Sequence, residues 1–207
     1  MTTTAPIAPL GLMPDWRIRQ LAETGMISPF EPGKIKEIHE EVFGAAMPAI
    51  SYGTSSYGYD FTLSANDFRV FHHVPGLIVN PKRFDQRCLI TAELQHDLWG
   101  KYFILPGHSY ALGFLVEKQK LPPNVTALYI GKSTYARCGI IVNTTPGEAG
   151  WEGHLTVEIS NSSGADVRIY ADEGICQGLF FEGAPCGKPY GDGKYQSQAA
   201  GVTVARG

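Results

Sequence analysis

The sequence lacks a long apolar run and a surplus of basic residues. No run among its 207 residues approaches the about 18 apolar residues that a membrane-spanning helix needs, and the N-terminus has no basic stretch followed by an apolar core. The formal net charge is −3, whereas duplex binding requires a broad positive field. These absences predict a cytoplasmic protein that binds neither membranes nor nucleic acids.

Metal-binding patterns are missing as well. The four cysteines are widely spaced without a CxxC pair, so we expect buried free thiols and neither a zinc knuckle nor a dense disulfide framework. Residues 39–41 (HEE) match the HxE part of the zinc deaminase signature and residues 185–186 (PC) match the start of PCxxC, but position 189 is proline. The histidines at 72, 73 and 154 lack partners at ligand spacing, so we predict no zinc.

Turn-forming residues, in contrast, are abundant. The chain contains 24 glycines and 14 prolines without low-complexity segments, and from about residue 51 the turn signals recur about every ten residues. Between them, polar and apolar residues alternate, which predicts an all-β sandwich or barrel. Strands are expected over residues 102–105, 111–116, 125–130, 139–145, 154–160, 167–170 and 176–181.

The first fifty residues differ from this pattern. Residues 1–13 are expected to form a loose arm, and Asp15 is expected to cap a short helix over residues 16–22 that stops near Gly25. Apolar residues at 35, 38, 42 and 43 form one helical stripe, which predicts a second helix over residues 35–43. A chain of this length buries one good core, so residues 1–207 are interpreted as a single domain.

Glu158 stands in the middle of a predicted strand. Alternation places the apolar residues 155, 157 and 159 on one face and Glu158 between Thr156 and Ser160 on the other. Glutamate is disfavoured inside strands, and a residue that breaks a local rule is often kept for a functional site. The alternative is an ordinary exposed carboxylate that faces water.

A cationic, hydroxyl-rich turn precedes this strand. Residues 131–137 (GKSTYAR) supply the cations Lys132 and Arg137 and the hydroxyls of Ser133 and Thr134. Arginine binds phosphate as a bidentate fork and lysine as a point charge, so the turn could hold phosphates. It is not a Walker P-loop, because the GxxxxGK[ST] pattern is absent. The alternative is a solvated basic turn.

The C-terminal segment, residues 187–207, combines glycine, glutamine and serine with tyrosines and a lysine. Glycines give freedom to close, tyrosines offer stacking faces, and Lys194 adds charge. This mixture suits a mobile lid that closes on a nucleotide. A disordered polar tail is the alternative.

Several separated motifs, taken together, resemble the dCTP deaminase family of the dUTPase-like superfamily, from about residue 16 to the end. The resemblance implies a distorted β-barrel or jelly roll with short N-terminal helices, assembled as a homotrimer with active sites at subunit interfaces. The motifs are residues 55–60 (SSYGYD), 131–139 (GKSTYARCG), 150–161 (GWEGHLTVEISN) and 194–198 (KYQSQ).

The resemblance also implies a reaction. It is the hydrolytic deamination of dCTP to dUTP and ammonia, which feeds dUMP and dTTP synthesis, without zinc and with Mg²⁺ bound only through the triphosphate. dTTP is implied as a candidate inhibitor. Glu158 matches the catalytic glutamate, and Ser133 and Arg137 match polar residues around the reacting water. Substrate contacts are implied for Lys132, Ser133, Thr134, Tyr135, Ala136, Arg137, Thr156, Val157, Gln177, Tyr190, Lys194 and Gln198.

The chain departs from the family at three places, one of which is the loop over residues 143–148, which is shorter than in some members. Glu148 and Ala149 stand where many relatives have an aspartate that contacts the sugar, so the role of Glu148 is open. Residues 31–50 look like an insertion without an assigned function.

Other activities stay open beside the deaminase. A bifunctional enzyme would continue from dCTP to dUMP and pyrophosphate, because the dUTPases of the superfamily use the same phosphate cradle. A trimeric nucleotide-binding regulator without catalysis is the alternative from another class, which the presence of both Glu158 and Arg137 disfavours.

Overall fold

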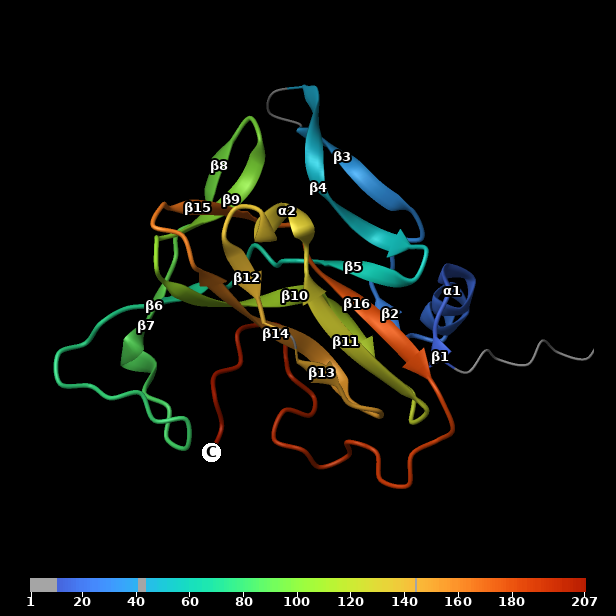
Figure 1. Ribbon diagram of the computed structural model, residues 1–207. Coiled ribbons are helices and arrows are strands. Elements are labelled where there is room, and N and C mark those ends of the chain that lie inside the picture. Colours follow the sequence, from blue (N-terminus) through green and yellow to red (C-terminus); the bar gives the residue numbers. More distant parts are fainter. Residues whose placement is uncertain (1–10, 41–43, 144) are drawn as a thin grey trace, which may run out of the picture.

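The computed structural model describes residues 11–40, 44–143 and 145–207, which form mostly strands (Figure 1). The helices are α1 (Asp15–Glu23), the 3-10 turn η1 (Gln86–Cys88) and α2 (Ser133–Ala136). The strands are β1 (Gly11–Leu12), β2 (Ile27–Ser28), β3 (Lys34–Glu40), β4 (Ala45–Ser55), β5 (Gly58–Thr62), β6 (Arg69–Phe71), β7 (Leu89–Thr91), β8 (Gln95–Asp97), β9 (Gly100–Leu105), β10 (Tyr110–Lys120), β11 (Val125–Gly131), β12 (Ile140–Val142), β13 (Pro146–Gly147), β14 (Glu152–Asn161), β15 (Val167–Tyr170) and β16 (Gly174–Glu182).

The described strands pair into three sheets. The largest has the order β13-β11-β16-β5-β4-β3, with β1 also paired to β16. The second has the order β12-β14-β10-β6-β7, with β2 also paired to β10, and a small third sheet has the order β15-β9-β8. The predicted β architecture is therefore confirmed. The sheets do not close into a barrel, so the fold is an open, distorted β structure.

The hydrophobic core lies between the two large sheets. Phe61 and Tyr129 of the first sheet meet edge to face, with ring centroids 5.7 Å apart. Leu115 and Ile159 of the second sheet are fully buried in the same cluster. Burial of one such apolar side chain stabilises the fold by about 1.5–3 kcal/mol. Packing against this core fixes the position of β10 and β14, and therefore of the side chains on the face of these strands that points away from the core.

The structure confirms the predicted strands with shifts at their ends. Residues 139–145 are the exception. Residue 144 lies outside the described part, and among the other residues of this range strand pairing is limited to β12, with β13 following as a separate short strand. Residues 55–60 form the end of β4, a two-residue turn and the start of β5, so this motif is a hairpin turn rather than one strand.

The first predicted helix is confirmed as α1, but its cap differs. Pro14 occupies the N-cap position and Asp15 is the first helical residue. Of the expected loose arm, residues 1–10 lie outside the described part. Residues 11–13 are anchored, since β1 pairs with β16 and Met13 is fully buried.

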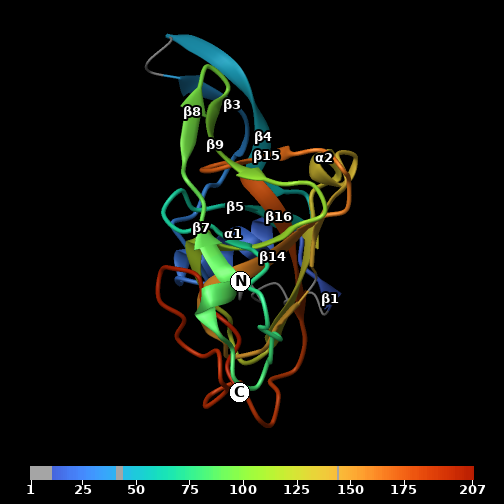
Figure 2. The same ribbon diagram turned by 90° about the vertical axis from the view of Figure 1, so that its left-hand side faces the viewer.

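The predicted helix over residues 35–43 is wrong. Lys34–Glu40 form β3, which pairs with β4, while residues 41–43 lie outside the described part. Cross-strand hydrogen bonds with β4, the other strand of the same hairpin, outweigh the weak helical preference of this stripe. The β3–β4 and β8–β9 hairpins project from the same end of the molecule, opposite the C-terminal segment (Figure 2).

All four cysteines are free. Cys88 and Cys176 are buried as expected, whereas Cys138 and Cys186 are exposed, so the prediction of buried thiols holds for only half of them. Within the described residues, no helix is both long enough and apolar enough to cross a membrane.

Candidate active site

A cavity of about 320 Å³ opens beside β14. Four predicted site residues line it: Thr156, Glu158, Tyr190 and Gln198. They come from two segments that are far apart in the sequence, β14 and the C-terminal segment. The cavity therefore unites the predicted catalytic carboxylate with Tyr190 and Gln198 of the predicted lid, whereas Lys194 does not line it.

Glu158 is held in the cavity by backbone pairing on both sides of its strand. Its strand neighbour on β10 is Leu112, and its carbonyl accepts a hydrogen bond from the Asn143 amide at 2.9 Å. Burial raises the pKa of the Glu158 carboxyl above its ordinary value. A carboxyl whose pKa moves toward neutrality can both accept and release a proton, as general acid and base chemistry requires.

Thr156 and Val157 point to opposite sides of β14, as the alternation predicts. The Thr156 hydroxyl donates to the Gln198 side chain at 3.2 Å and accepts from the Thr203 amide at 2.9 Å. Val157 is buried in the core, so only its backbone can reach a ligand in the cavity. Thr156 thus ties the C-terminal segment to the strand that carries Glu158.

The C-terminal segment is fastened along the start of β14. The Trp151 indole donates to the Tyr195 carbonyl at 2.7 Å, and the His154 amide donates to the Gln198 carbonyl at 3.0 Å. Gly153 permits this approach, because its φ is +148° and a Cβ there would lie 2.6 Å from the Gln198 amide nitrogen. Lys194 is exposed, and its carbonyl accepts from Arg206.

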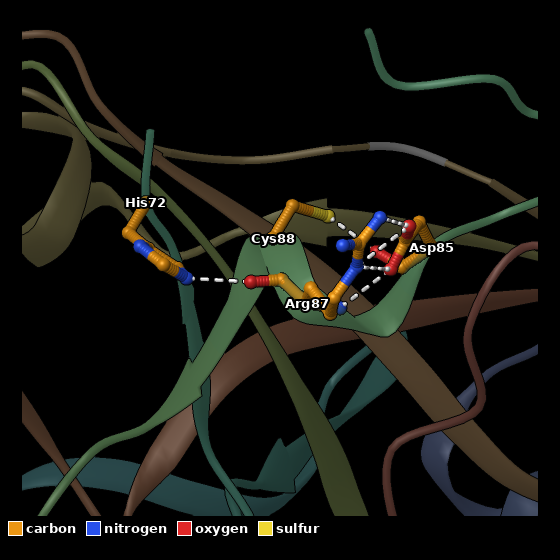
Figure 3. A network of polar contacts seen from close by, with 4 residues as sticks. All are labelled: His72, Asp85, Arg87 and Cys88. Carbon is orange, nitrogen blue, oxygen red and sulfur yellow. Dashed lines mark hydrogen bonds and ion pairs between the residues drawn. The ribbon is translucent and has the colours of Figure 1, made fainter. Parts of the chain in front are cut away.

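The opposite wall of the cavity was not predicted from the sequence. It is formed by Phe71 and Phe84, whose rings meet edge to face at 6.0 Å. Phe84 precedes a network that fixes the end of its loop: Asp85 pairs with Arg87 at 2.6 Å, and the Arg87 carbonyl lies 2.6 Å from His72 Nε2 (Figure 3). Phe71 and Phe84 stand far from any sequence motif, so the sequence alone does not distinguish them from phenylalanines of the hydrophobic core.

The cationic turn lies elsewhere in the chain. Residues 133–136 form the single helical turn α2, and Ser133, Thr134, Ala136 and Arg137 are exposed. In Figures 1 and 2, α2 lies toward the projecting hairpins, whereas the C-terminal segment lies at the other end.

Two residues of this turn serve the fold directly. Tyr135 is buried, its hydroxyl accepts from the Tyr170 amide at 2.8 Å, and burial raises its pKa. Its side chain is therefore part of the core. The Lys132 ammonium lies 2.7 Å from Asp60 and 3.2 Å from the Ser51 hydroxyl.

Gln177 lies on the outer face of the seven-stranded sheet, where its side-chain amide donates to the Ser55 hydroxyl at 2.9 Å. The predicted residues thus fall into two groups in one chain. The cavity group is Thr156, Glu158, Tyr190 and Gln198, and the sheet-face group is Lys132, Ser133, Arg137 and Gln177.

Glu148 also lines the cavity, so the carboxylate that departs from the family pattern faces the same space as Glu158. Among the residues that the structure describes, no group of three or more His, Cys, Asp and Glu side chains is arranged to hold a metal ion.

The chain matches known proteins over most of its length. The family model described as dCTP deaminase-like matches residues 12–183. The dCTP deaminases of Laribacter hongkongensis and Alcanivorax borkumensis are 45% and 47% identical, and each match covers 92% of this chain and 96% of the relative. A solved 2′-deoxycytidine 5′-triphosphate deaminase from Agrobacterium tumefaciens shares the fold, with a TM-score of 0.53 and 17% identity over 84% of this chain and 48% of that longer protein. This chain belongs to the dCTP deaminase-like family.

Proposed function

We propose that this protein is a dCTP deaminase, which converts dCTP and water to dUTP and ammonia. Family membership over residues 12–183 and the relatives named dCTP deaminase support the substrate. The observation that carries the chemistry is Glu158, a carboxyl with a raised pKa that lines a cavity large enough for a nucleoside.

In the proposed reaction, Glu158 moves protons between water and the cytosine ring. It takes a proton from the attacking water as the oxygen bonds to C4, and it delivers this proton to N3. It then takes the proton of the new C4 hydroxyl, as the C4 carbonyl of dUTP forms, and delivers that proton to the departing amino group. The C4–N4 bond breaks and ammonia leaves. One carboxyl can perform these steps in turn because its raised pKa suits both directions of transfer.

The sheet-face group would complete this site from a second copy of the chain. Ser133 and Arg137 are the proposed partners of the reacting water, yet α2 lies far from the C-terminal segment that closes the cavity. A neighbouring copy could bring its exposed α2 to this cavity. A homotrimer with sites at its interfaces is therefore the proposed assembly, as the family resemblance implies.

The triphosphate is proposed to bind cations from two copies of the chain. Lys132 and Arg137 would come from one copy and Lys194 from the other, with the hydroxyls of Ser133 and Thr134 as further donors. Mg²⁺ is proposed to enter with the triphosphate as part of the substrate, and the chemistry is proposed to need no zinc. dTTP has the same sugar and triphosphate as dCTP and is proposed to compete with dCTP for this site. The reaction is proposed to take place in the cytoplasm.

Incubation of the protein with dCTP and Mg²⁺, followed by chromatography of the nucleotides and assay of ammonia, tests this function. Accumulation of dUTP with an equal amount of ammonia is the expected result. dUMP with pyrophosphate would indicate the bifunctional enzyme instead, and tight dCTP binding without ammonia would indicate a regulator. Activity that disappears on zinc chelation and returns with zinc would contradict the zinc-free mechanism.

A further inference from the structure

A buried carboxylate lies between two lysines on the outer face of the large sheet. Asp60 Oδ2 is 2.7 Å from the Lys132 ammonium and 2.8 Å from the Lys34 ammonium. The Asp60 side chain is 2% exposed, that of Lys132 is 10% exposed, and that of Lys34 is 36% exposed. We call Lys34, Asp60 and Lys132 the two-lysine cluster.

Strand register places this cluster beside Gln177. Gln177 is paired with Asp60 across β16 and β5, Asp60 with Gly53 across β5 and β4, and Gly53 with Lys34 across β4 and β3. Residues directly opposite one another share a face of the sheet. Ile130, which pairs with Gln177 on the other side, is 39% exposed, so this row faces outward.

The charges of the cluster do not cancel. Two ammonium groups and one carboxylate leave a net charge of +1. If Lys34 were absent, the Asp60 carboxylate would cancel the charge of the Lys132 ammonium. Lys132 would then contribute no net positive charge to the turn at α2. The Lys34 side chain is also more exposed than that of Lys132, so a ligand can contact the Lys34 ammonium without a movement of the strand. Lys34 belongs to β3, in the segment 31–50 to which the family resemblance assigns no function.

We propose that the two-lysine cluster binds the terminal phosphates of a nucleoside triphosphate and that Lys34 supplies its surplus positive charge. Asp60 is a positioning residue in this arrangement, because it fixes both ammonium groups through one oxygen. The proposal rests on the proposed function for the nucleotide part of the ligand. The proposal adds a phosphate contact from Lys34, which lies on β3 and not on the turn that carries Lys132.

Calorimetry with inorganic triphosphate tests the cluster without requiring turnover. Lys34→Met should weaken triphosphate binding about fivefold, because a unit charge near an anion at the protein surface is partly screened by water and salt. Lys34→Arg should bind nearly as well as the wild type. Lys36→Met, on the same strand but outside the cluster, is the matched control and should leave binding unchanged.

Kinetics with dCTP provides a second readout. Lys34→Met should raise KM for dCTP about fivefold at low salt with kcat unchanged, and added salt should reduce the difference from the wild type. Binding of dCMP, which lacks the terminal phosphates, should not change. A merely structural role for Lys34 would weaken dCMP and dCTP alike.

Equal triphosphate affinity of Lys34→Met and the wild type would overturn the proposal, as would equal losses for dCMP and dCTP or a wild type that binds no triphosphate. Thermal denaturation of each variant checks that the fold is intact. A wild type that binds triphosphate through Lys34 but releases no ammonia from dCTP would contradict the proposed function alone.

Discussion

At the scale of single residues, Glu158 shows what a sequence can reveal about a site. The strand pattern alone leaves it open between a site residue and an exposed carboxylate, and the family resemblance assigns it the catalytic role. The structure places it in a cavity, where burial raises the pKa of its carboxyl. Phe84 lines the same cavity without any such signal, since an isolated phenylalanine conforms to every local rule.

Replacement of Glu158 by glutamine should abolish proton transfer while preserving the shape of the cavity. We expect kcat for ammonia release to fall by at least about 10²–10⁴-fold, the usual contribution of general acid and base groups. The dissociation constant for dCTP, measured by calorimetry, should change far less. The assay is ammonia release at saturating dCTP.

Glu152→Gln is a suitable control for this variant. Glu152 lies at the start of the same strand and pairs with Lys118, outside the residues that line the cavity. Its loss should leave kcat within about twofold of the wild type, because surface ion pairs contribute little. Undiminished dUTP formation by Glu158→Gln would refute the assignment of Glu158.

At the scale of elements, long strands with clear alternation were predictable and the first fifty residues were not. Alternation in β11 and over most of β14 reports burial on one face, whereas residues 111–115 of β10 form a continuous buried run. β3 has a stripe that also fits a helix, and only its pairing with β4 decides the outcome. The spacing of apolar residues within one segment does not report whether the next segment will pair with it as a strand.

The contact between β14 and the C-terminal segment depends on Gly153. Gly153→Ala would place a methyl group 2.6 Å from the Gln198 amide nitrogen at a φ of +148°. Strain of this kind costs about 1–3 kcal/mol, so the segment should detach and kcat/KM for dCTP should fall about tenfold or more. Steady-state kinetics measures the loss, and limited proteolysis should show faster cleavage near Lys194.

Gly183→Ala provides the comparison for this prediction. Gly183 precedes the same segment, and a Cβ there would meet no atom within 4 Å. This variant should keep wild-type kinetics and wild-type resistance to protease. Equal behaviour of Gly153→Ala and Gly183→Ala would show that the close approach at β14 is dispensable.

At the scale of the whole molecule, the predicted site residues of one chain fall into two groups, and we propose that these groups meet only between copies of the chain. α2 lies toward the projecting hairpins, whereas the C-terminal segment lies at the other end of the fold. The family resemblance linked them in the prediction, because their proximity would arise between copies. A pattern within one sequence carries no direct record of contacts between subunits.

The fold also buries two carboxyls whose titration links stability to pH. Glu117 accepts hydrogen bonds from the Thr62 amide and hydroxyl, and Glu173 accepts from the Ile50 amide beside the carboxylate of Asp172. Burial raises the pKa of each from 4.5 to about 7. The folded protein therefore holds more protons than the unfolded chain between these two values.

Because of these two groups, the free energy of unfolding should decrease as pH rises from about 4.5 to about 7 and level off above that range. Their contribution is complete below the unfolded pKa and is lost as pH passes the folded pKa. Urea denaturation at pH 5, 6, 7 and 8 measures the slope. Glu117→Gln, which stays neutral, should flatten it, since one of the two protons no longer titrates. An unchanged slope in that variant would mean that Glu117 is already ionised throughout this range in the folded protein.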